Sequence, residues 1–435
     1  MNRFNKSEIL KHQQHFYFNR NKGTIKLITG ERNGDGTVKN FRFKNPTDIR
    51  FGTGRLDVEL HDAVSQFGSR VLFVYGGHSI KKSGLYDTVK GLLADLQLTE
   101  LPGIEPNPKI ASIREGQKLV KDNDVEVVLA VGGGSVIDAA KVIASAKFYD
   151  GDPWDLVKDR GVTRHKLPQL PVVDILTLAA TGSEMNSGSV ISNPETHEKL
   201  GTNGPNTPAV SFLDPTLTYT VPHRQTAAGS MDIFSHLLEQ YFDRSKNNDA
   251  SKGMMEGLMR TVIKWAPIAV KEPDNFDARA NLMWSATMAL NGVMSVANEN
   301  GWTVHSLEHE LSAYYDITHG VGLGILTPRW MEYALTKDST TAEMFARFGR
   351  HVWDLEGDET YAVAQAAIDE TFDWIQHLGF PMTLPEVGIA DERHFDAMAT
   401  AAVANARLET RAYVPLSEED VKAIYQAAMT DGLTA

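Results

Sequence analysis

The stretch VEVVLAVGGGSVIDAAKVIASAKF, residues 125–148, decides the fold. A continuous apolar run ends in a glycine turn and is followed by a segment with helical spacing, which is typical of a buried parallel strand leading into a helix. Similar strand-and-turn patterns occur in RVLFVYGG (70–77) and PVVDILTLAATGS (171–183). Strands that alternate with helices predict a parallel sheet covered by helices on both faces.

The pattern changes after about Pro222, where the β-branched runs give way to long segments of helical spacing. These segments continue to SEEDVKAIYQAAM (417–429), for which Ser417 is the expected N-cap. We therefore expect three parts. Residues 1–39 form an N-terminal extension with a short hairpin near 33–36, residues 40–221 form an α/β domain whose first strand begins near Phe41, and residues 222–435 form an all-helical domain.

Composition and charge exclude several classes of protein. The 435 residues include 56 acidic and 43 basic side chains, a net charge of −13, which argues against nucleic acid as the main partner. The absence of cysteine excludes disulfides, thiolate nucleophiles and cysteine-ligated zinc. No apolar run approaches the roughly 18–20 residues that would cross a bilayer, and the N-terminus lacks the apolar core of a signal peptide. We expect a cytoplasmic protein with no membrane partner.

The glycine turn at 132–135 is a candidate phosphate site. Glycines between a strand and a helix expose backbone N–H groups at the positive end of the helix, and Ser135 can add a hydroxyl donor. The spacing is not G-x-G-x-x-G, and a plain turn that needs glycine for close packing is the alternative interpretation. A further turn, from Thr177 to Ser183, supplies hydroxyls and Gly182 at another strand end.

The turn after RVLFVY bears on the choice of dinucleotide. Gly77 and Ser79 lie in this turn, Lys81 and Lys82 follow, and no acidic residue stands where one would hold a ribose 2′-hydroxyl. Cations at this position suit a 2′-phosphate, which predicts NADP. The alternative is that the lysines are ordinary solvated surface residues.

Two pairs of side chains have the spacing of metal ligands. Asp232 and His236 are four residues apart in a helical segment, as are His305 and His309, so each pair shares one helix face. With His319 they offer a mixed nitrogen and oxygen set that suits Fe²⁺ or Zn²⁺. Spacing does not decide which of the three later histidines is the spare one. A spare histidine beside a metal could relay a proton, whereas isolated histidines are usually structural.

Several of these motifs resemble the iron-containing, group III alcohol dehydrogenases. They are VGGGSVIDAAK (131–141), TLAATGSEMN (177–186), GSMDIFSHLLEQY (229–241) and HSLEHELSAYYDITHGVGLGILTP (305–328). The segments FGTG, YGGHSIKKSG and GIEPNP are most similar to the NADPH-dependent butanol dehydrogenase or aldehyde reductase branch. The resemblance implies a dinucleotide-binding α/β domain with a parallel sheet and an all-α catalytic domain, in the dehydroquinate synthase-like arrangement, with the active site between them.

The resemblance also implies roles for individual residues. It assigns the metal, iron or zinc, to Asp232, His236, His305 and His319, and leaves His309 near the substrate as a catalytic residue. It places the pyrophosphate on Gly133, Gly134 and Ser135. The further cofactor contacts that it implies are Thr177, Leu178, Thr181, Ser183 and Lys199. Separately from the resemblance, we expect Gly77, Ser79 and Lys81, in and after the turn that follows RVLFVY, and Asp138 to contact the cofactor. Members of the family often form homodimers through the first strand, here near 41–51, and residues 1–39 have no counterpart.

The expected function is that of a metal-dependent NADP(H) oxidoreductase. It would interconvert small aldehydes and primary alcohols by hydride transfer while the metal polarises the carbonyl oxygen. One alternative is an NAD-dependent polyol or glycerol dehydrogenase. Another is a metal-dependent cyclase or lyase such as dehydroquinate synthase, which is disfavoured because residues 300–320 contain no Lys or Arg for an acidic substrate. A binding protein with an inactive site is a third.

Overall fold

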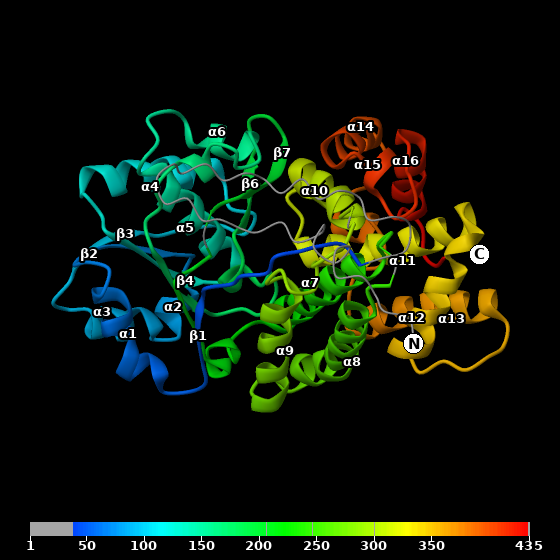
Figure 1. The fold of residues 1–435 in the computed structure, drawn as a ribbon, viewed down its shortest axis with the longest axis horizontal. Coiled ribbons are helices and arrows are strands. Elements are labelled where there is room, and N and C mark those ends of the chain that lie inside the picture. The colour runs from blue at the N-terminus through cyan, green and yellow to red at the C-terminus, as the bar shows by residue number, and fades with distance from the viewer. Residues whose placement is uncertain (1–37, 206, 246, 300, 434–435) are drawn as a thin grey trace, which may run out of the picture.

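The chain folds into an α/β region followed by a helical region (Figure 1). The computed structural model describes residues 38–205, 207–245, 247–299 and 301–433. The α/β region lies on the left of Figure 1 and the helical region on the right. This arrangement confirms the predicted fold class, an N-terminal domain with a parallel sheet and an all-α C-terminal part. The predicted hairpin near 33–36 lies outside the described residues.

A six-stranded sheet with the order β1-β8-β5-β4-β2-β3 organises the α/β region. All of its strand pairs are parallel. The order reverses between β2 and β4, and the carboxyl ends of strands at such a point are where open α/β sheets bind ligands. The strands are β1 (Asp48–Phe51), β2 (Arg70–Tyr75), β3 (Gln97–Leu101), β4 (Val127–Gly132), β5 (Val172–Leu176) and β8 (Val210–Leu213).

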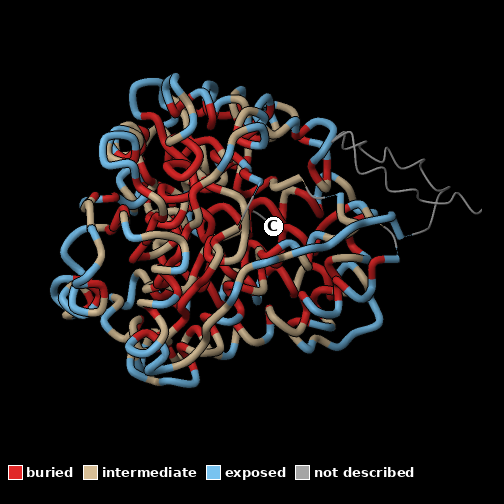
Figure 2. The backbone as a smooth tube through the Cα atoms, turned by 60° about the vertical axis from the view of Figure 1, so that its left-hand side comes forward, coloured by how far each residue is buried: buried red, intermediate tan, exposed pale blue. Residues whose placement is uncertain are grey.

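Helices cover both faces of this sheet, which explains why the central strands β4 and β5 are buried along their whole length. One apolar cluster joins the sheet to α1 (Arg55–Ser65) and α3 (Leu85–Leu92), and another joins it to α4 (Ile110–Asp122) and α5 (Gly134–Ala146). The short helices α2 (Ser79–Lys82) and α6 (Pro153–Lys158) complete the layers. Figure 2 shows the buried core running through both regions.

Two features differ from the sequence-based expectation. The first strand begins at Asp48 and not near Phe41, because Phe41 and Phe43 are exposed and Pro46 lacks the N–H that a strand pairs. The second is an antiparallel hairpin, β6 (Gly188–Asn193) with β7 (Glu198–Asn203), that stands apart from the main sheet. The alternating strand and helix pattern gave no sign of this hairpin, which contacts α5 on one side and α10 on the other.

The helical region is built around α7 (His223–Tyr241), which is buried at every position from Thr226 to Tyr241. Ser417 caps the last helix in a reciprocal capping box with Asp420, as predicted. No helix in the described part of the chain is long and apolar enough to span a membrane. The other helices are α8 (Asp249–Lys271), α9 (Phe276–Ala289), α10 (Thr303–Tyr315), α11 (His319–Lys337), α12 (Ala342–Val352), α13 (Thr360–His377), α14 (Phe395–Ala406), α15 (Leu408–Arg411) and α16 (Glu418–Ala427).

The start of α11 packs directly on the backbone of α7. A Cβ atom added to Gly320 would lie 2.1 Å from the carbonyl oxygen of Ala228. We expect Gly320→Ala to lower the free energy of unfolding by about 1–3 kcal/mol, because the two helices must separate to admit the methyl group. Urea denaturation should show this loss.

The matched control for Gly320 is Gly257→Ala, because Gly257 lies inside α8 with open space where its Cβ would be. Alanine there should leave the protein equally stable or more stable by up to about 1 kcal/mol, since alanine favours a helix over glycine. Equal effects of the two substitutions would contradict the close packing of α11 on α7.

Glu310 is buried between α10 and α14, where its carboxyl group accepts a hydrogen bond of 3.2 Å from Asn405 Nδ2. Burial raises the pKa of Glu310 to about 7. The folded protein therefore holds this proton more tightly than the unfolded chain, so stability is lost as pH rises from about 4.3 towards 7, by up to roughly 3 kcal/mol.

We expect Glu310→Gln to raise the melting temperature relative to the wild type at pH 8 but not at pH 5. The amide keeps the shape of the protonated acid and cannot ionise. The control is Glu370→Gln, on an exposed position of α13. A wild-type pH dependence that survives Glu310→Gln unchanged would contradict this assignment.

Candidate active site

The candidate metal ligands come from three helices of the helical region. Asp232 and His236 lie one turn apart on α7, and His305 lies on α10. His319 is the first residue of α11, and the connection before it turns at Asp316, whose φ of 49° is left-handed. This turn brings the ring of His319 back to 5.2 Å from the ring of His305, measured between centroids.

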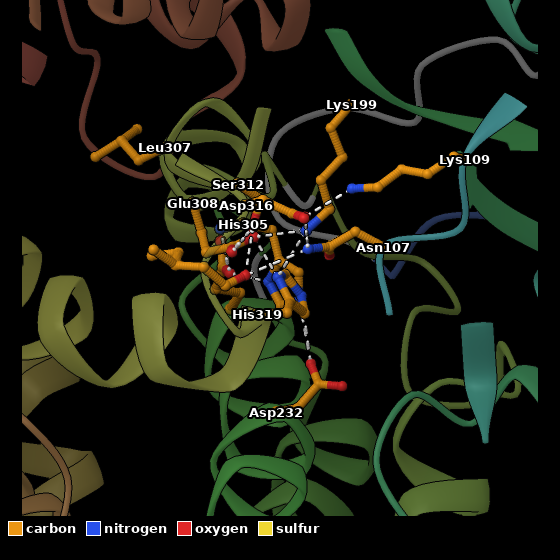
Figure 3. A network of polar contacts seen from close by, with 12 residues as sticks. Asn107, Lys109, Lys199, Asp232, His305, Leu307, Glu308, Ser312, Asp316 and His319 are labelled. Atoms are coloured by element: carbon orange, nitrogen blue, oxygen red, sulfur yellow. Dashed lines mark hydrogen bonds and ion pairs between the residues drawn. The ribbon is translucent and has the colours of Figure 1, made fainter. Parts of the chain in front are cut away.

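These side chains converge on one oxygen atom, Oδ1 of Asp232. It lies 3.6 Å from His236 Nδ1, 3.6 Å from His305 Nε2 and 3.6 Å from His319 Nε2. Ligand atoms of Asp232, His305 and His319 all lie within 4.8 Å of one another, and Figure 3 shows these three side chains facing one another. His236 lies outside that mutual group but beside Asp232, with its ring stacked 4.6 Å from that of His305.

The polar atoms at this point are suited to a divalent cation. Asp232 Oδ1, His236 Nδ1 and His305 Nε2 are buried and have no hydrogen-bond partner within the described residues. Each buried polar atom left in this way costs about 1–3 kcal/mol. A tetrahedral cation with bonds of about 2.1 Å holds its ligand atoms roughly 3.4 Å apart, close to the distances found here. A set of imidazoles and one carboxylate fits Fe²⁺ or Zn²⁺.

The protonation states of Asp232 and His236 are those that a cation needs. Burial lowers the pKa of His236 to about 3, so this imidazole is neutral. Burial alone would raise the pKa of Asp232, but the neighbouring rings of His236, His305 and His319 hold it below its ordinary value. The site therefore presents an ionised carboxylate and a neutral imidazole, both with lone pairs that a metal can accept.

Two buried carboxylates, which the sequence analysis missed, hold the histidine rings. Glu239 on α7 accepts hydrogen bonds from the backbone N–H groups of Val304, at 2.7 Å, and His305, at 3.0 Å, and pairs with Nδ1 of His305. Glu308 on α10 pairs in the same way with Nδ1 of His319. In metal sites generally, a carboxylate that accepts the Nδ1 hydrogen bond orients Nε2 for a metal. The signal in the sequence was spacing, because Glu239 follows His236 and Glu308 follows His305 by three residues, which places each carboxylate on the helix face of a candidate ligand.

These carboxylates also set the charge of the rings. Burial opposes protonation of His305, but the carboxylate of Glu239 outweighs it and raises the pKa of His305 to about 9. A cation bound at this site would therefore displace a proton from the ring of His305. Burial would raise the pKa of Glu308, but His319 and Lys199 keep it below its ordinary value. Glu308 is thus ionised although no part of it is exposed.

His309 occupies a different position from the other histidines. Its ring centroid lies 6.3 Å from that of His305 and 5.7 Å from that of His319, and it groups with Glu308 and His319 and not with Asp232. Burial, with the nearby Lys199 ammonium, keeps the pKa of His309 well below its ordinary value. A neutral imidazole beside His305 and His319 can exchange a proton with a group bound there.

The predicted phosphate turn lies between β4 and α5. The first residues of α5, Gly134 and Ser135, have no side-chain cap, so their N–H groups are available to an anion. A Cβ atom on Gly134 would lie 2.2 Å from Thr181 Oγ1, and one on Gly133 would lie 3.2 Å from Leu178 Cβ. The turns after β4 and β5 are therefore in contact. Glycine at 133 and 134 allows this close packing and also leaves the backbone N–H groups accessible to an anion.

The turn after β2 lies beside the turn after β4, because β2 and β4 are neighbouring strands and the strand order reverses between them. Gly77, Ser79 and Lys81 are exposed there. The Lys81 ammonium lies over the rings of Tyr75, at 5.4 Å, and Tyr86, at 4.8 Å, and has no ion-pair partner among the residues that the structure describes. An unpaired cation is therefore held at the edge of the sheet where a dinucleotide would bind.

Three other predicted cofactor residues bond to the protein itself. Ser183 donates a hydrogen bond to Asp138, whose other oxygen accepts the N–H of Val190 at 2.7 Å. Lys199, on β7, is buried and bonds to Glu308 at 3.1 Å. Their contact with a cofactor stays a prediction.

Family models match most of the chain. The model described as iron-containing alcohol dehydrogenase matches residues 46–215, and the C-terminal model of the Fe-containing alcohol dehydrogenase family matches residues 226–429. The chain belongs to the iron-containing alcohol dehydrogenase family and is an NAD(P)-dependent alcohol dehydrogenase of its butanol dehydrogenase and aldehyde reductase branch.

Individual relatives agree with this assignment. The chain is 46% identical over 391 residues to NADH-dependent butanol dehydrogenase A of Clostridium acetobutylicum, covering 89% of this chain and 98% of that protein. It is 38% identical over 357 residues to the NADPH-dependent aldehyde reductase YqhD of Escherichia coli, covering 81% and 90%. The crystal structure of NADH-dependent butanol dehydrogenase A of Thermotoga maritima superimposes with a TM-score of 0.83 at 38% identity, covering 91% of this chain and all (100%) of that one.

We expect His305→Ala to remove bound metal and turnover together. The substitution deletes the ring nitrogen of His305 that lies within 4.8 Å of the ligand atoms of Asp232 and His319. Elemental analysis of the purified variant gives the metal content, and reduction of butanal followed through NADPH absorbance gives the turnover. His377→Ala, at an exposed position near the end of α13, is the control and should match the wild type. Full metal content in His305→Ala would contradict the ligand assignment.

Proposed function

We propose that this chain is a metal-dependent NADP(H) oxidoreductase that interconverts small aldehydes and primary alcohols. The observation that carries the proposal is that Asp232 Oδ1, His236 Nδ1 and His305 Nε2 are buried together without a hydrogen-bond partner among the described residues. Several buried polar atoms without hydrogen bonds in one place are costly unless a cation joins them. The proposed ligands are Asp232, His236, His305 and His319, and the proposed ion is Fe²⁺ or Zn²⁺.

When bound, the cation polarises the carbonyl oxygen of an aldehyde and the reduced nicotinamide provides a hydride. The chain supplies position and charge. Asp232 offsets the positive charge of the cation, and Glu239 and Glu308 hold the rings of His305 and His319 so that each Nε2 faces it. Because these groups are fixed by buried contacts, little reorganisation is needed as charge develops on the substrate oxygen.

His309 is the proposed proton carrier. In this proposal one ring nitrogen of His309 releases its proton towards the nascent alkoxide during reduction while the other ring nitrogen takes a proton from solvent water, and the two transfers run in reverse during alcohol oxidation. Its neutral state, imposed by burial and Lys199, leaves one ring nitrogen free to accept. His309→Ala should therefore lower turnover more than it lowers metal content.

The proposed preference for NADPH rests on the turn after β2. Ser79 and the unpaired Lys81 are exposed there and suit a 2′-phosphate, and the strand ends without an acidic side chain that would select NAD. The names of relatives point both ways, since those from Clostridium acetobutylicum are called NADH-dependent and the one from Escherichia coli NADPH-dependent.

We expect Lys81→Met to lower kcat/KM for NADPH by roughly 10-fold and to leave kcat/KM for NADH nearly unchanged, because only the 2′-phosphate needs the charge. Steady-state kinetics with both nucleotides measures this. The control is Lys82→Met, an adjacent exposed lysine. A strong preference of the wild type for NADH would contradict the assignment of Ser79 and Lys81.

The phosphate turn is proposed to hold the pyrophosphate on Gly133, Gly134 and Ser135. The remaining cofactor contacts proposed are Gly77, Asp138, Thr177, Leu178, Thr181, Ser183 and Lys199. A homodimer through β1 is supported by the position of that strand at the edge of the sheet, where it pairs with β8 alone among the described strands. The division into domains at 39/40 and 221/222 and a cytoplasmic location stay predictions.

The decisive test combines elemental analysis with a substrate panel of short aldehydes and alcohols, run with both nucleotides. One divalent metal per chain and NADPH-dependent reduction of butanal are expected. Metal-loaded protein that is inactive on the whole panel would overturn the proposal.

A further inference from the structure

A chain of buried polar contacts crosses from the α/β region to one metal ligand. Lys199, on β7, donates a hydrogen bond of 3.1 Å to Glu308 Oε2, and its Nζ lies 3.3 Å from His319 Nδ1. The same Glu308 oxygen pairs with His319 Nδ1, and Ser312 donates to the other oxygen. Lys199 is 5% exposed and Glu308 0% exposed, so this contact is shielded from water.

The other supported histidine has no such link. Nδ1 of His305 pairs with Glu239, which is on α7 and whose other hydrogen-bond partners in the described part of the chain are the backbone N–H groups of Val304 and His305. The support of His305 is thus contained within the helical region, whereas the support of His319 reaches the hairpin of the α/β region.

Further contacts from the α/β region end on the same stretch of chain (Figure 3). Asn107 donates to Asp316 Oδ1 at 3.0 Å and to the carbonyl oxygen of Ile317 at 3.3 Å, and Lys109 pairs with Asp316 at 2.7 Å. Asp316 and Ile317 belong to the connection between α10 and α11 that leads into His319. The placement of His319 therefore depends on the α/β region at both its backbone and its ring.

We propose that Glu308 is a positioning residue and that Lys199 acts through it, so that the α/β region sets how well His319 binds the metal. This inference rests on the proposed function, because it takes His319 as a metal ligand. Glu308 accepts a hydrogen bond from Nδ1–H of His319, which keeps the proton on Nδ1 and leaves the lone pair of Nε2 for the cation. Lys199 holds the carboxylate of Glu308 in the orientation that reaches Nδ1.

The burial of this ion pair supports a positioning role. Taking an ammonium and a carboxylate out of water is costly, and a buried pair adds little net stability compared with apolar side chains of the same size. Its loss on one side, however, leaves the other charge unpaired. A cation on Lys199 that served only to contact a dinucleotide would have no effect on metal binding when the nucleotide is absent, and this difference can be measured.

The experiment measures the affinity of the nucleotide-free, metal-free protein for Co²⁺, by competition with a chromophoric chelator. Lys199→Met and Glu308→Ala should each weaken Co²⁺ binding by roughly 10–100-fold, the usual cost of losing a group that orients a metal ligand. Glu308→Gln should recover part of the loss, because its amide oxygen can still accept a hydrogen bond from Nδ1–H of His319. The visible absorption of bound Co²⁺ should shift in Glu308→Ala, as the ligand field at His319 changes.

A double-mutant comparison separates the two supports. The effects of Lys199→Met and Glu308→Ala should not add, because both act on His319, whereas those of Lys199→Met and Glu239→Gln should add. Should Glu308→Ala not fold, Ser312→Ala removes the other contact to Glu308 more gently and should weaken Co²⁺ binding a few-fold.

The outcomes that would overturn this inference differ from those that would overturn the proposed function. Wild-type Co²⁺ affinity in nucleotide-free Lys199→Met would assign Lys199 to the nucleotide alone and overturn the positioning role. Additive effects of Lys199→Met and Glu308→Ala would do the same. A wild-type protein that binds no Co²⁺, or His305→Ala with unchanged affinity, would instead overturn the metal site itself and this inference with it.

Discussion

A carboxylate buried among imidazoles is the constraint on which this structure depends. Asp232 Oδ1 lies at the same distance, 3.6 Å, from nitrogen atoms of three histidines that come from three helices. None of these polar contacts is favourable enough alone to offset burial, so the helices must be held together by other means. The apolar packing around α7 and the close approach of Gly320 to Ala228 provide them.

The two regions of the chain contribute different chemistry to one place. The α/β region offers backbone N–H groups at the start of α5 and the cation of Lys81, which suit a dinucleotide. The helical region offers the hard ligands that suit a divalent metal. The β6–β7 hairpin lies between them, and through Lys199 it joins the sheet to the helices at Glu308.

Much of the fold could be predicted because local sequence patterns indicate its helices and strands. The apolar runs of β4 and β5, the helical spacing after Pro222 and the cap at Ser417 each act within a few residues. The predicted start of the first strand near Phe41 was wrong. Whether an apolar residue such as Phe41 is buried depends on which other segments of the chain pack against it, and this is not visible in the local sequence. The β6–β7 hairpin escaped detection because its short polar strands resemble loops.

In the candidate site, too, some features follow from local sequence patterns and others from contacts between distant segments. The sequence by itself determined which side chains share a helix face, such as Asp232 with His236, since a helix places residues four apart on one side. Only the tertiary structure decided that ligand atoms of His305 and His319 lie within 4.8 Å of Asp232 and that His309 is outside this group. Glu239 was likewise found only in the structure. These facts depend on contacts between segments far apart in the chain, which packing sets and no local pattern encodes.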